Sequence, residues 1–294
     1  MIRARKRFGQ HFLEPAWVDK VIRAIGPNPD DAFVEIGPGP GALTRPLAAR
    51  VRTLVAYEID RDLAAALRAN AIENLTVVEA DFLGVENLEP RTKNPKPGTT
   101  NPEPRTENRE PRTENPEPRT QNAEPRTPNP VRVAGNLPYN VASPIMFKLA
   151  ELFAAGAPIV DAAVMLQREV ADRLTASPGT REYGVLSVLM QHVADIELLL
   201  KLPAGAFRPP PKVLSSLVRL RFHAPAPPVT DPIRFAAVVQ AVFTRRRKTL
   251  SNALLAYTDA ASAVRGIAAA GLDGCKRPET LSVADFVRLA DALV

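Results

Sequence analysis

A glycine-rich turn between a strand and a helix constrains the fold more than any other feature of this 294-residue chain. The turn runs from Glu35 to Gly41 as Glu-Ile-Gly-Pro-Gly-Pro-Gly, after an apolar strand expected over 31–34 and before a helix expected over 42–48. This order opens a doubly wound α/β domain, in which glycines let the backbone approach a ligand closely. The spacing differs from Gly-x-Gly-x-x-Gly, and the acidic residue before the turn favours a ligand with a cationic or amino group over a phosphate.

Polar residues also stand at the ends of three further apolar strands, expected over 53–57, 75–80 and 131–135. They are Glu58, Asp81 and Asn136. Open α/β sheets bind ligands at the carboxyl ends of their strands. An acid in the position of Glu58, at the end of the second strand, typically binds ribose hydroxyls. Each acid alone fits a helix cap or a solvated turn equally well. Together they predict a ligand site at one edge of the sheet.

The tetrapeptide Asn136-Leu137-Pro138-Tyr139 fits recognition of an exocyclic amine on a flat aromatic base. Asn136 supplies a side-chain carbonyl, Leu137 and Pro138 form a turn with a free backbone carbonyl, and Tyr139 supplies a ring for stacking. Turns of this composition also occur without any ligand. The glycine-rich run from Glu35 to Gly41, a hundred residues earlier, is what gives the motif a chemical meaning.

With these motifs the chain resembles the ribosomal RNA small-subunit adenine N6,N6-dimethyltransferases of the kasugamycin-resistance type. These enzymes use S-adenosylmethionine to modify two adjacent adenosines near the 3′ end of small-subunit rRNA. The resemblance covers nearly everything outside residues 90–130, and it rests in addition on the blocks 5–13, 57–60, 207–213 and 245–249. It implies a Rossmann-like methyltransferase domain over 1–223 and a small all-helical RNA-binding domain over 224–294.

The resemblance also implies which residues form the cofactor site. S-adenosylmethionine would lie against His11, Leu13, Gly37, Glu58, Asp81 and Asn136, and Glu35 and Gly39 of the glycine turn complete the predicted site. Glu58 would hold the ribose diol, and Asp81 would accept from the adenine amine. Family members commonly carry asparagine at position 11, so the backbone of His11 is expected to serve rather than its side chain.

The predicted catalytic residues are Asn136, Leu137, Pro138, Tyr139 and Phe207. Acceptors on Asn136 and Leu137 would orient the target amine and stabilise its developing positive charge. Tyr139 would stack on the adenine once it is splayed from its neighbours. Phe207, in a proline-rich loop, would cover the other face of the base or would be a hydrophobic plug between domains.

Clusters of basic residues suggest RNA as a partner of this chain, whose net charge is +6. Two clusters are predicted to bind RNA phosphates, the first formed by Arg5, Lys6 and Arg7 and the second by Arg245, Arg246, Arg247 and Lys248. Either cluster alone could also be a solvated helix face. A single cysteine and three scattered histidines predict no disulfide and no metal site. No run approaches the about 20 apolar residues of a membrane span, and no secretory signal is present, so a cytoplasmic protein is expected.

Residues 89–130 form a proline-rich insertion in which Glu-Pro-Arg-Thr recurs at 89, 103, 110, 117 and 124. With almost no apolar side chains the segment is expected to be disordered, and its deletion is expected to leave activity and stability nearly intact.

The rest of the chain predicts helices over 15–25, 144–154, 168–175, 185–193 and 283–293 (capped by Ser282), and strands over 162–166, 196–200 and 213–222. The late strands fit an antiparallel edge on the otherwise parallel sheet.

The leading hypothesis is dimethylation of small-subunit rRNA in ribosome biogenesis, with the rRNA or an immature small subunit as partner and a monomeric enzyme. Two alternatives are a large-subunit rRNA adenine N6-methyltransferase and a non-catalytic ribosome-assembly factor that binds RNA.

Overall fold

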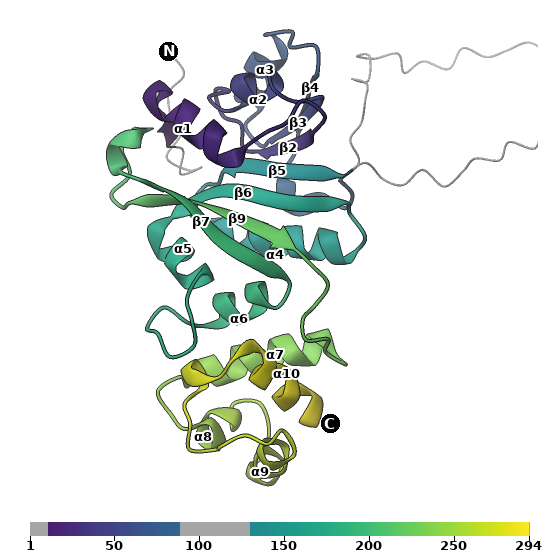
Figure 1. Cartoon of the computed structure of the whole chain (residues 1–294), viewed down its shortest axis with the longest axis vertical. Coiled ribbons are helices and arrows are strands. Elements are labelled where there is room, and N and C mark those ends of the chain that lie inside the picture. Colours follow the sequence, from purple (N-terminus) through teal and green to yellow (C-terminus); the bar gives the residue numbers. More distant parts are fainter. Residues whose placement is uncertain (1–10, 89–129, 294) are drawn as a thin grey trace, which may run out of the picture.

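A computed structural model of the protein describes residues 11–88 and 130–293. A seven-stranded sheet, in the order β4-β3-β2-β5-β6-β9-β7, forms its centre (Figure 1). The strands are β2 (Ala32–Ile36), β3 (Thr53–Glu58), β4 (Leu75–Glu79), β5 (Val131–Asn136), β6 (Ile159–Gln167), β7 (Ala194–Leu202) and β9 (Ser215–Phe222). The first five in the sheet order run parallel, whereas β9 pairs antiparallel with both β6 and β7. The predicted α/β sheet with an antiparallel edge is confirmed.

Helices cover both faces of this sheet, as the alternation of its side chains requires. On β5 and β6, Val133 and Val164 face a core that includes α4 (Ala142–Ala154), whereas Ala134 and Met165 face a core that includes α1 (Pro15–Ile25). Figure 1 shows α1 to α3 on one side of the sheet and α4 to α6 on the other. The remaining helices of this part are α2 (Thr44–Ala48), α3 (Arg61–Arg68), α5 (Arg168–Leu174) and α6 (Val185–Gln191), with short 3-10 turns η2 (Phe82–Gly84) and η3 (Ala204–Ala206).

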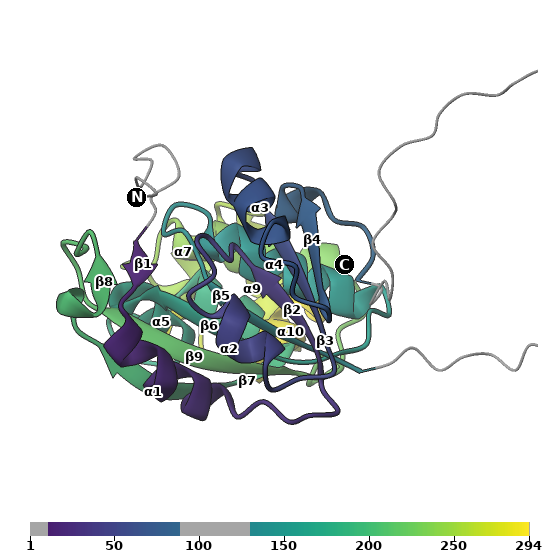
Figure 2. The same ribbon diagram turned by 90° about the horizontal axis from the view of Figure 1, so that it is seen from above.

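A second, two-stranded sheet was not predicted. It pairs β1 (Phe12–Leu13) antiparallel with β8 (Phe207–Arg208), so that Leu13 lies opposite Phe207. Figure 2 shows the two strands side by side at one end of the molecule. This contact brings residues from the beginning of the described chain to the carboxyl ends of the parallel strands.

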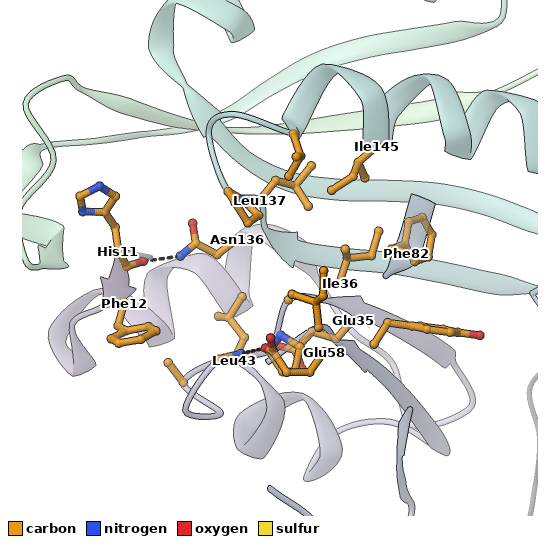
Figure 3. A pocket seen from close by; sticks show the side chains of 18 of the residues that line it. His11, Phe12, Glu35, Ile36, Leu43, Glu58, Phe82, Asn136, Leu137 and Ile145 are labelled. Carbon is orange, nitrogen blue, oxygen red and sulfur yellow. Dashed lines mark hydrogen bonds between the residues drawn. The ribbon is translucent and has the colours of Figure 1, made fainter. Parts of the chain in front are cut away.

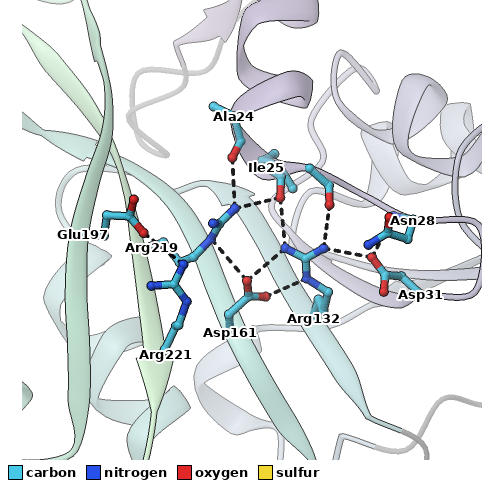
Figure 4. A network of polar contacts seen from close by, with 10 residues as sticks. Ala24, Ile25, Asn28, Asp31, Arg132, Asp161, Glu197, Arg219 and Arg221 are labelled. Carbon is cyan, nitrogen blue, oxygen red and sulfur yellow. Dashed lines mark hydrogen bonds and ion pairs between the residues drawn. The ribbon is translucent and has the colours of Figure 1, made fainter.

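A buried charge network connects the C-terminal end of α1 to the edge of the sheet at which the parallel strands β5 and β6 begin (Figure 4). Arg132 pairs with Asp161 and with Asp31, each at 2.8 Å, and Arg219 pairs with Asp161 at 3.2 Å. Both guanidinium groups also donate to the carbonyl oxygen of Ile25 at the C-terminal end of α1. Because α1 follows β1 directly in the chain, this network helps to fix the position of β1.

The C-terminal helices form a separate core below the sheet in Figure 1. They are α7 (Pro232–Phe243), α8 (Leu250–Leu254), α9 (Ala260–Ala269) and α10 (Val283–Ala292), with the 3-10 turn η4 (Pro278–Thr280) between the last two. Ser282 caps α10 as predicted, in a capping box with Asp285. Their core also takes in Tyr183 and Val188 from the larger part of the chain, and the division at residue 223 stays a prediction.

Several sequence-based expectations concern residues outside the described part of the chain. These are the basic cluster Arg5, Lys6 and Arg7 and nearly all of the repeat insertion, residues 89–129. Within the described ranges, no helix combines the length and the apolar character that crossing a bilayer demands.

Candidate active site

A cavity opens where the carboxyl ends of β2, β3, β4 and β5 meet. Every residue predicted for the cofactor site lines it: His11, Leu13, Glu35, Gly37, Gly39, Glu58, Asp81 and Asn136. Parallel pairing of β2 with β5 sets Ile36 opposite Gly135, and the strands are close enough that a Cβ on Gly135 would lie 2.7 Å from the Ile36 carbonyl oxygen. The glycine turn and Asn136 therefore emerge side by side.

The glycine turn wraps around the carboxylate of Glu58. Gly37 and Gly39 have φ of 66° and 58°, values that favour glycine. In this conformation the amide of Gly39 donates to Glu58 Oε2, and the amide of Asp60 donates to Oε1, both at 2.9 Å. Burial raises the pKa of Glu58, and the two amides oppose that rise. The carboxylate is held rigidly at the cavity wall, with lone pairs left for further donors.

Glu35 is a buried carboxyl group on β2. Only 2 % of its surface is exposed, and its Oε2 atom has no hydrogen-bond partner among the described residues. Its pKa is raised from 4.5 to about 8: burial is the main cause, the nearby Thr44 hydroxyl opposes it, and the charge of Glu58 adds to it. An unengaged polar atom of this kind at a cavity wall indicates a missing partner, because buried polar groups are almost always satisfied.

The orientation of Asn136 follows from a contact with His11, the residue directly before β1. Its amide nitrogen donates to the backbone carbonyl of His11 at 2.6 Å, so Oδ1 is directed elsewhere (Figure 3). Its carbonyl-type oxygen is therefore available as an acceptor at the cavity. The backbone carbonyl of His11 thus fixes Asn136, and the contact expected between this backbone and the cofactor stays a prediction.

Tyr139 lies beside this acceptor. Its hydroxyl shares a hydrogen bond of 2.8 Å with the hydroxyl of Ser215 at the start of β9. The ring of His11 stacks against it, with centroids 5.3 Å apart and an angle of 25° between the planes. Neither Ser215 nor the His11 ring was predicted to contact Tyr139, since both come from distant parts of the chain.

The prediction that Phe207 covers one face of the target base is wrong in this structure. Phe207 is 1 % exposed and does not line the cavity. It pairs with Leu13 in the small sheet and packs in the core shared with α1. Its alternative role, as a plug between domains, is not met either, because this core belongs to the larger part of the chain alone.

Asp81 combines its predicted position with an ordinary structural role. The side chain caps the short turn η2 by accepting from the amide of Leu83 at 3.0 Å, and the residue also lines the cavity.

The sequence analysis did not predict the apolar residues that line the cavity, which include Phe12, Ile36, Leu43, Tyr57, Ile59, Phe82 and Ile145. A usable signal for two of them was their position directly after a strand-end acid, as Ile59 follows Glu58 and Phe82 follows Asp81.

The second basic run lies between α7 and α8. Arg245, Arg247 and Lys248 are exposed. Arg246 is half-buried and pairs with Glu279 at 2.8 Å, and it also donates to the carbonyl of Arg181. Three of the four cations thus face solvent, while the charge of the fourth is already compensated within the protein.

The sheet order and the cavity at the strand ends define the Rossmann-like fold of the S-adenosylmethionine-dependent methyltransferases. A family model described as ribosomal RNA adenine dimethylase matches residues 1–293, and the chain belongs to that family. It is therefore an rRNA adenine dimethyltransferase by family.

Two curated relatives are similar over nearly the whole chain. Ribosomal RNA small subunit methyltransferase A of Acinetobacter baylyi is 40 % identical over 99 % of this chain and 93 % of its own length. The protein of the same name from Alcanivorax borkumensis is 40 % identical over 98 % and 90 %. Among solved structures, the 23S rRNA methyltransferase ErmE is 26 % identical with a TM-score of 0.61, covering 96 % of this chain and 99 % of that one. A dimethyladenosine transferase from Plasmodium falciparum shares the fold, with a TM-score of 0.67 at 21 % identity over 95 % of this chain and 96 % of its own.

Proposed function

We propose that this chain transfers methyl groups from S-adenosylmethionine to N6 of two adjacent adenosines near the 3′ end of small-subunit rRNA, during ribosome biogenesis. Two relatives named small-subunit methyltransferases, similar over nearly full length, support the choice of subunit. The observation that carries the chemistry is the position of Asn136, which turns an acceptor oxygen to a cavity beside the glycine turn.

The residues of the cavity fit this cofactor. Its amino acid part carries an ammonium group, which suits the buried and unengaged oxygen of Glu35. Its ribose has two neighbouring hydroxyls, which suit the fixed carboxylate of Glu58 at the end of β3. Gly37 and Gly39 let the backbone come close to it, and Asp81 would accept from its adenine amine. When bound, S-adenosylmethionine supplies an electrophilic methyl group on a sulfonium.

The neighbouring residues would prepare the target amine. The lone pair of an adenine amine is delocalised into the ring, so the amine must be turned out of the ring plane before it can attack. Asn136 Oδ1 and the carbonyl of Leu137 would accept its two hydrogens, hold that geometry and stabilise the developing positive charge. Pro138, directly after Leu137, restricts the backbone of the turn that leads to Tyr139. Tyr139, held by Ser215, would stack on the base.

A second cavity suggests a path for the RNA. It is lined by Ser143 and Phe147 of α4, which begins just after the Asn136–Tyr139 motif, and by residues of facing segments that carry both charges: Arg173, Arg181, Arg246, Glu169 and Glu182. Arg173 pairs with Glu169 and Arg246 pairs with Glu279, so the charges of these two arginines are compensated within the protein. Phe147 is 38 % exposed there, and its ring would be able to stack on an unpaired base. Exposed Arg245, Arg247 and Lys248 would contact phosphates nearby.

The proposal is tested with purified protein, S-adenosylmethionine and ribosomal subunits that lack the modification. Mass spectrometry of the digested rRNA should find dimethyladenosine in small subunits and none above background in large subunits. Methylation of large subunits instead would favour the antibiotic-resistance type of activity. Folded protein that does not bind S-adenosylmethionine in a titration calorimeter would leave only a non-catalytic RNA-binding role.

Replacing Tyr139 separates its role from that of the cofactor residues. Tyr139→Ala should lower turnover roughly tenfold or more, because base stacking on an aromatic ring contributes about 1–3 kcal/mol. Cofactor affinity, measured by calorimetry, should change much less. Tyr139→Phe is the matched control, since it keeps the ring and removes only the bond to Ser215. Equal losses of turnover and cofactor affinity in the alanine variant would contradict the stacking role.

A further inference from the structure

The ring of His11 occupies one face of Tyr139 in the protein without RNA. The two rings stack with centroids 5.3 Å apart, and Nδ1 of His11 lies 2.7 Å from the carbonyl oxygen of Pro209. Tyr139 is itself held by Ser215. The imidazole is therefore anchored at the ring that the proposed reaction needs for the target base.

His11 lies against both residues that the proposed reaction assigns to the target base, Tyr139 and Asn136. The backbone carbonyl of His11 accepts from the amide nitrogen of Asn136 at 2.6 Å, so His11 contacts both residues at once. An adenine that stacks on Tyr139 and donates its amine hydrogens to Asn136 must lie between the same two groups. The imidazole and the adenine thus compete for one space.

The gap between the rings is also too narrow to admit a base as a third layer. Carbon atoms of stacked layers stay about 3.5 Å apart, so a base between two rings needs about 7 Å between the outer rings. The observed centroid separation is 5.3 Å. Phe207, the other aromatic residue considered for this slot, is buried elsewhere and cannot help to enclose the base.

We propose that the His11 imidazole is a placeholder, which fills the base slot of the free enzyme and is displaced by the target adenine. This rests on the function proposed above. The slot then opens only for a base that stacks on Tyr139 better than an imidazole does, which an unpaired purine with its larger ring achieves. His11 is a specificity-determining residue, and it acts by occupying the slot and not by touching the reacting atoms.

Nuclear magnetic resonance tests the contact directly, because the chain has only three histidines. In the free protein the His11 ring protons should resonate upfield of the usual range, and Tyr139→Leu should abolish that shift. A short RNA hairpin with two adjacent unpaired adenosines, added with S-adenosylhomocysteine, should abolish it in the wild type. The signals of His192, which packs on Phe235 at 4.5 Å, serve as the internal reference and should stay in place. A His11 signal that keeps its upfield shift in the RNA complex would overturn the proposal.

Kinetics provide the second test, with undermethylated small subunits as substrate. His11→Ala and His11→Asn should raise kcat/KM roughly three- to tenfold, the factor expected for removing a competing aromatic pair. His11→Phe, which restores a stacked ring, should return kcat/KM to or below the wild-type value, and His223→Ala should match the wild type. An unchanged or lower kcat/KM in the alanine variant would refute the placeholder role. If the wild type itself neither binds S-adenosylmethionine nor methylates these particles, the proposed function fails instead.

Discussion

Glu35→Gln should make the protein more stable, and increasingly so as the pH rises. The folded protein holds the Glu35 proton up to a pKa of about 8, whereas the unfolded chain releases it near 4.5. Between these values the folded state binds one more proton than the unfolded state at this residue. Stability must therefore fall with rising pH, and the loss is complete above about pH 8.

The size of the effect follows from the same two values. One unit of pKa corresponds to about 1.4 kcal/mol, so the wild type loses about 3 kcal/mol at pH 7 through this residue and about 5 kcal/mol above pH 8. Glutamine cannot ionise, and it has nearly the same shape as glutamate. It also brings a donor to Thr44, whose hydroxyl has no hydrogen-bond partner within the described residues. The variant should therefore match the wild type near pH 4.5 and exceed it by about 3 kcal/mol at pH 7.

Urea unfolding followed by circular dichroism at pH 5, 6, 7 and 8 measures this difference. Glu73→Gln, on an exposed carboxyl group, is the control and should give no pH-dependent gain. Curves for the wild type and Glu35→Gln that stay parallel from pH 5 to 8 would refute the reasoning. Calorimetry adds a functional readout, because an ammonium group beside Glu35 would ionise it. Cofactor binding at pH 7 should release protons in the wild type and release fewer in the variant.

Two further substitutions test the packing that supports the site. Gly135→Ala places a Cβ 2.7 Å from a backbone oxygen of β2 and should lower the free energy of unfolding by about 1–3 kcal/mol. Gly84→Ala is the control, because a Cβ there meets no atom within 4 Å and should change the free energy of unfolding little. Equal effects of the two substitutions would contradict the inference that close packing of β5 against β2 requires glycine at position 135. Arg132→Met leaves the buried carboxylate of Asp161 with one fewer partner and should destabilise the fold by about 3 kcal/mol. Arg168→Met, at an exposed ion pair with Asp172, should lose less than about 1 kcal/mol, and a loss that matches Arg132→Met would argue against the buried network.

Much of the site could be predicted because parallel strands end at one edge. Each apolar run of the sequence ends in a polar residue, and parallel pairing then gathers Glu58, Asp81 and Asn136 around the glycine turn without further information. The same local logic located the capping residue Ser282. These features depend on short stretches of sequence, which is why one sequence sufficed to find them.

The contacts of Phe207 and His11 escaped prediction because they depend on the small sheet, whereas the missed bond between Tyr139 and Ser215 depends on β9. The strands β1 and β8 of the small sheet have two residues each, too few to show any periodicity, and their partners lie nearly two hundred residues apart. The sequence shows an aromatic residue in a proline-rich loop at Phe207, but it cannot show that Leu13 pairs with it. For that reason Phe207 was expected at the base and is found in the core.

The segment around the small sheet also decides which end of the Asn136 side chain faces the cavity that Asn136 lines. The asparagine side chain has a donor end and an acceptor end, and the sequence does not say which one faces the ligand. His11, directly before β1, supplies the answer, because its carbonyl can only accept and therefore takes the amide nitrogen of Asn136. The oxygen is left for the amine that the proposed function assigns to it, and the ring of His11 lies on Tyr139. His11, held directly before β1, thus orients the acceptor and covers the ring of Tyr139. A change that displaces β1, and with it the carbonyl of His11, should therefore lower the rate of methyl transfer even where the proposed cofactor contacts at the ends of β2 and β3 are intact.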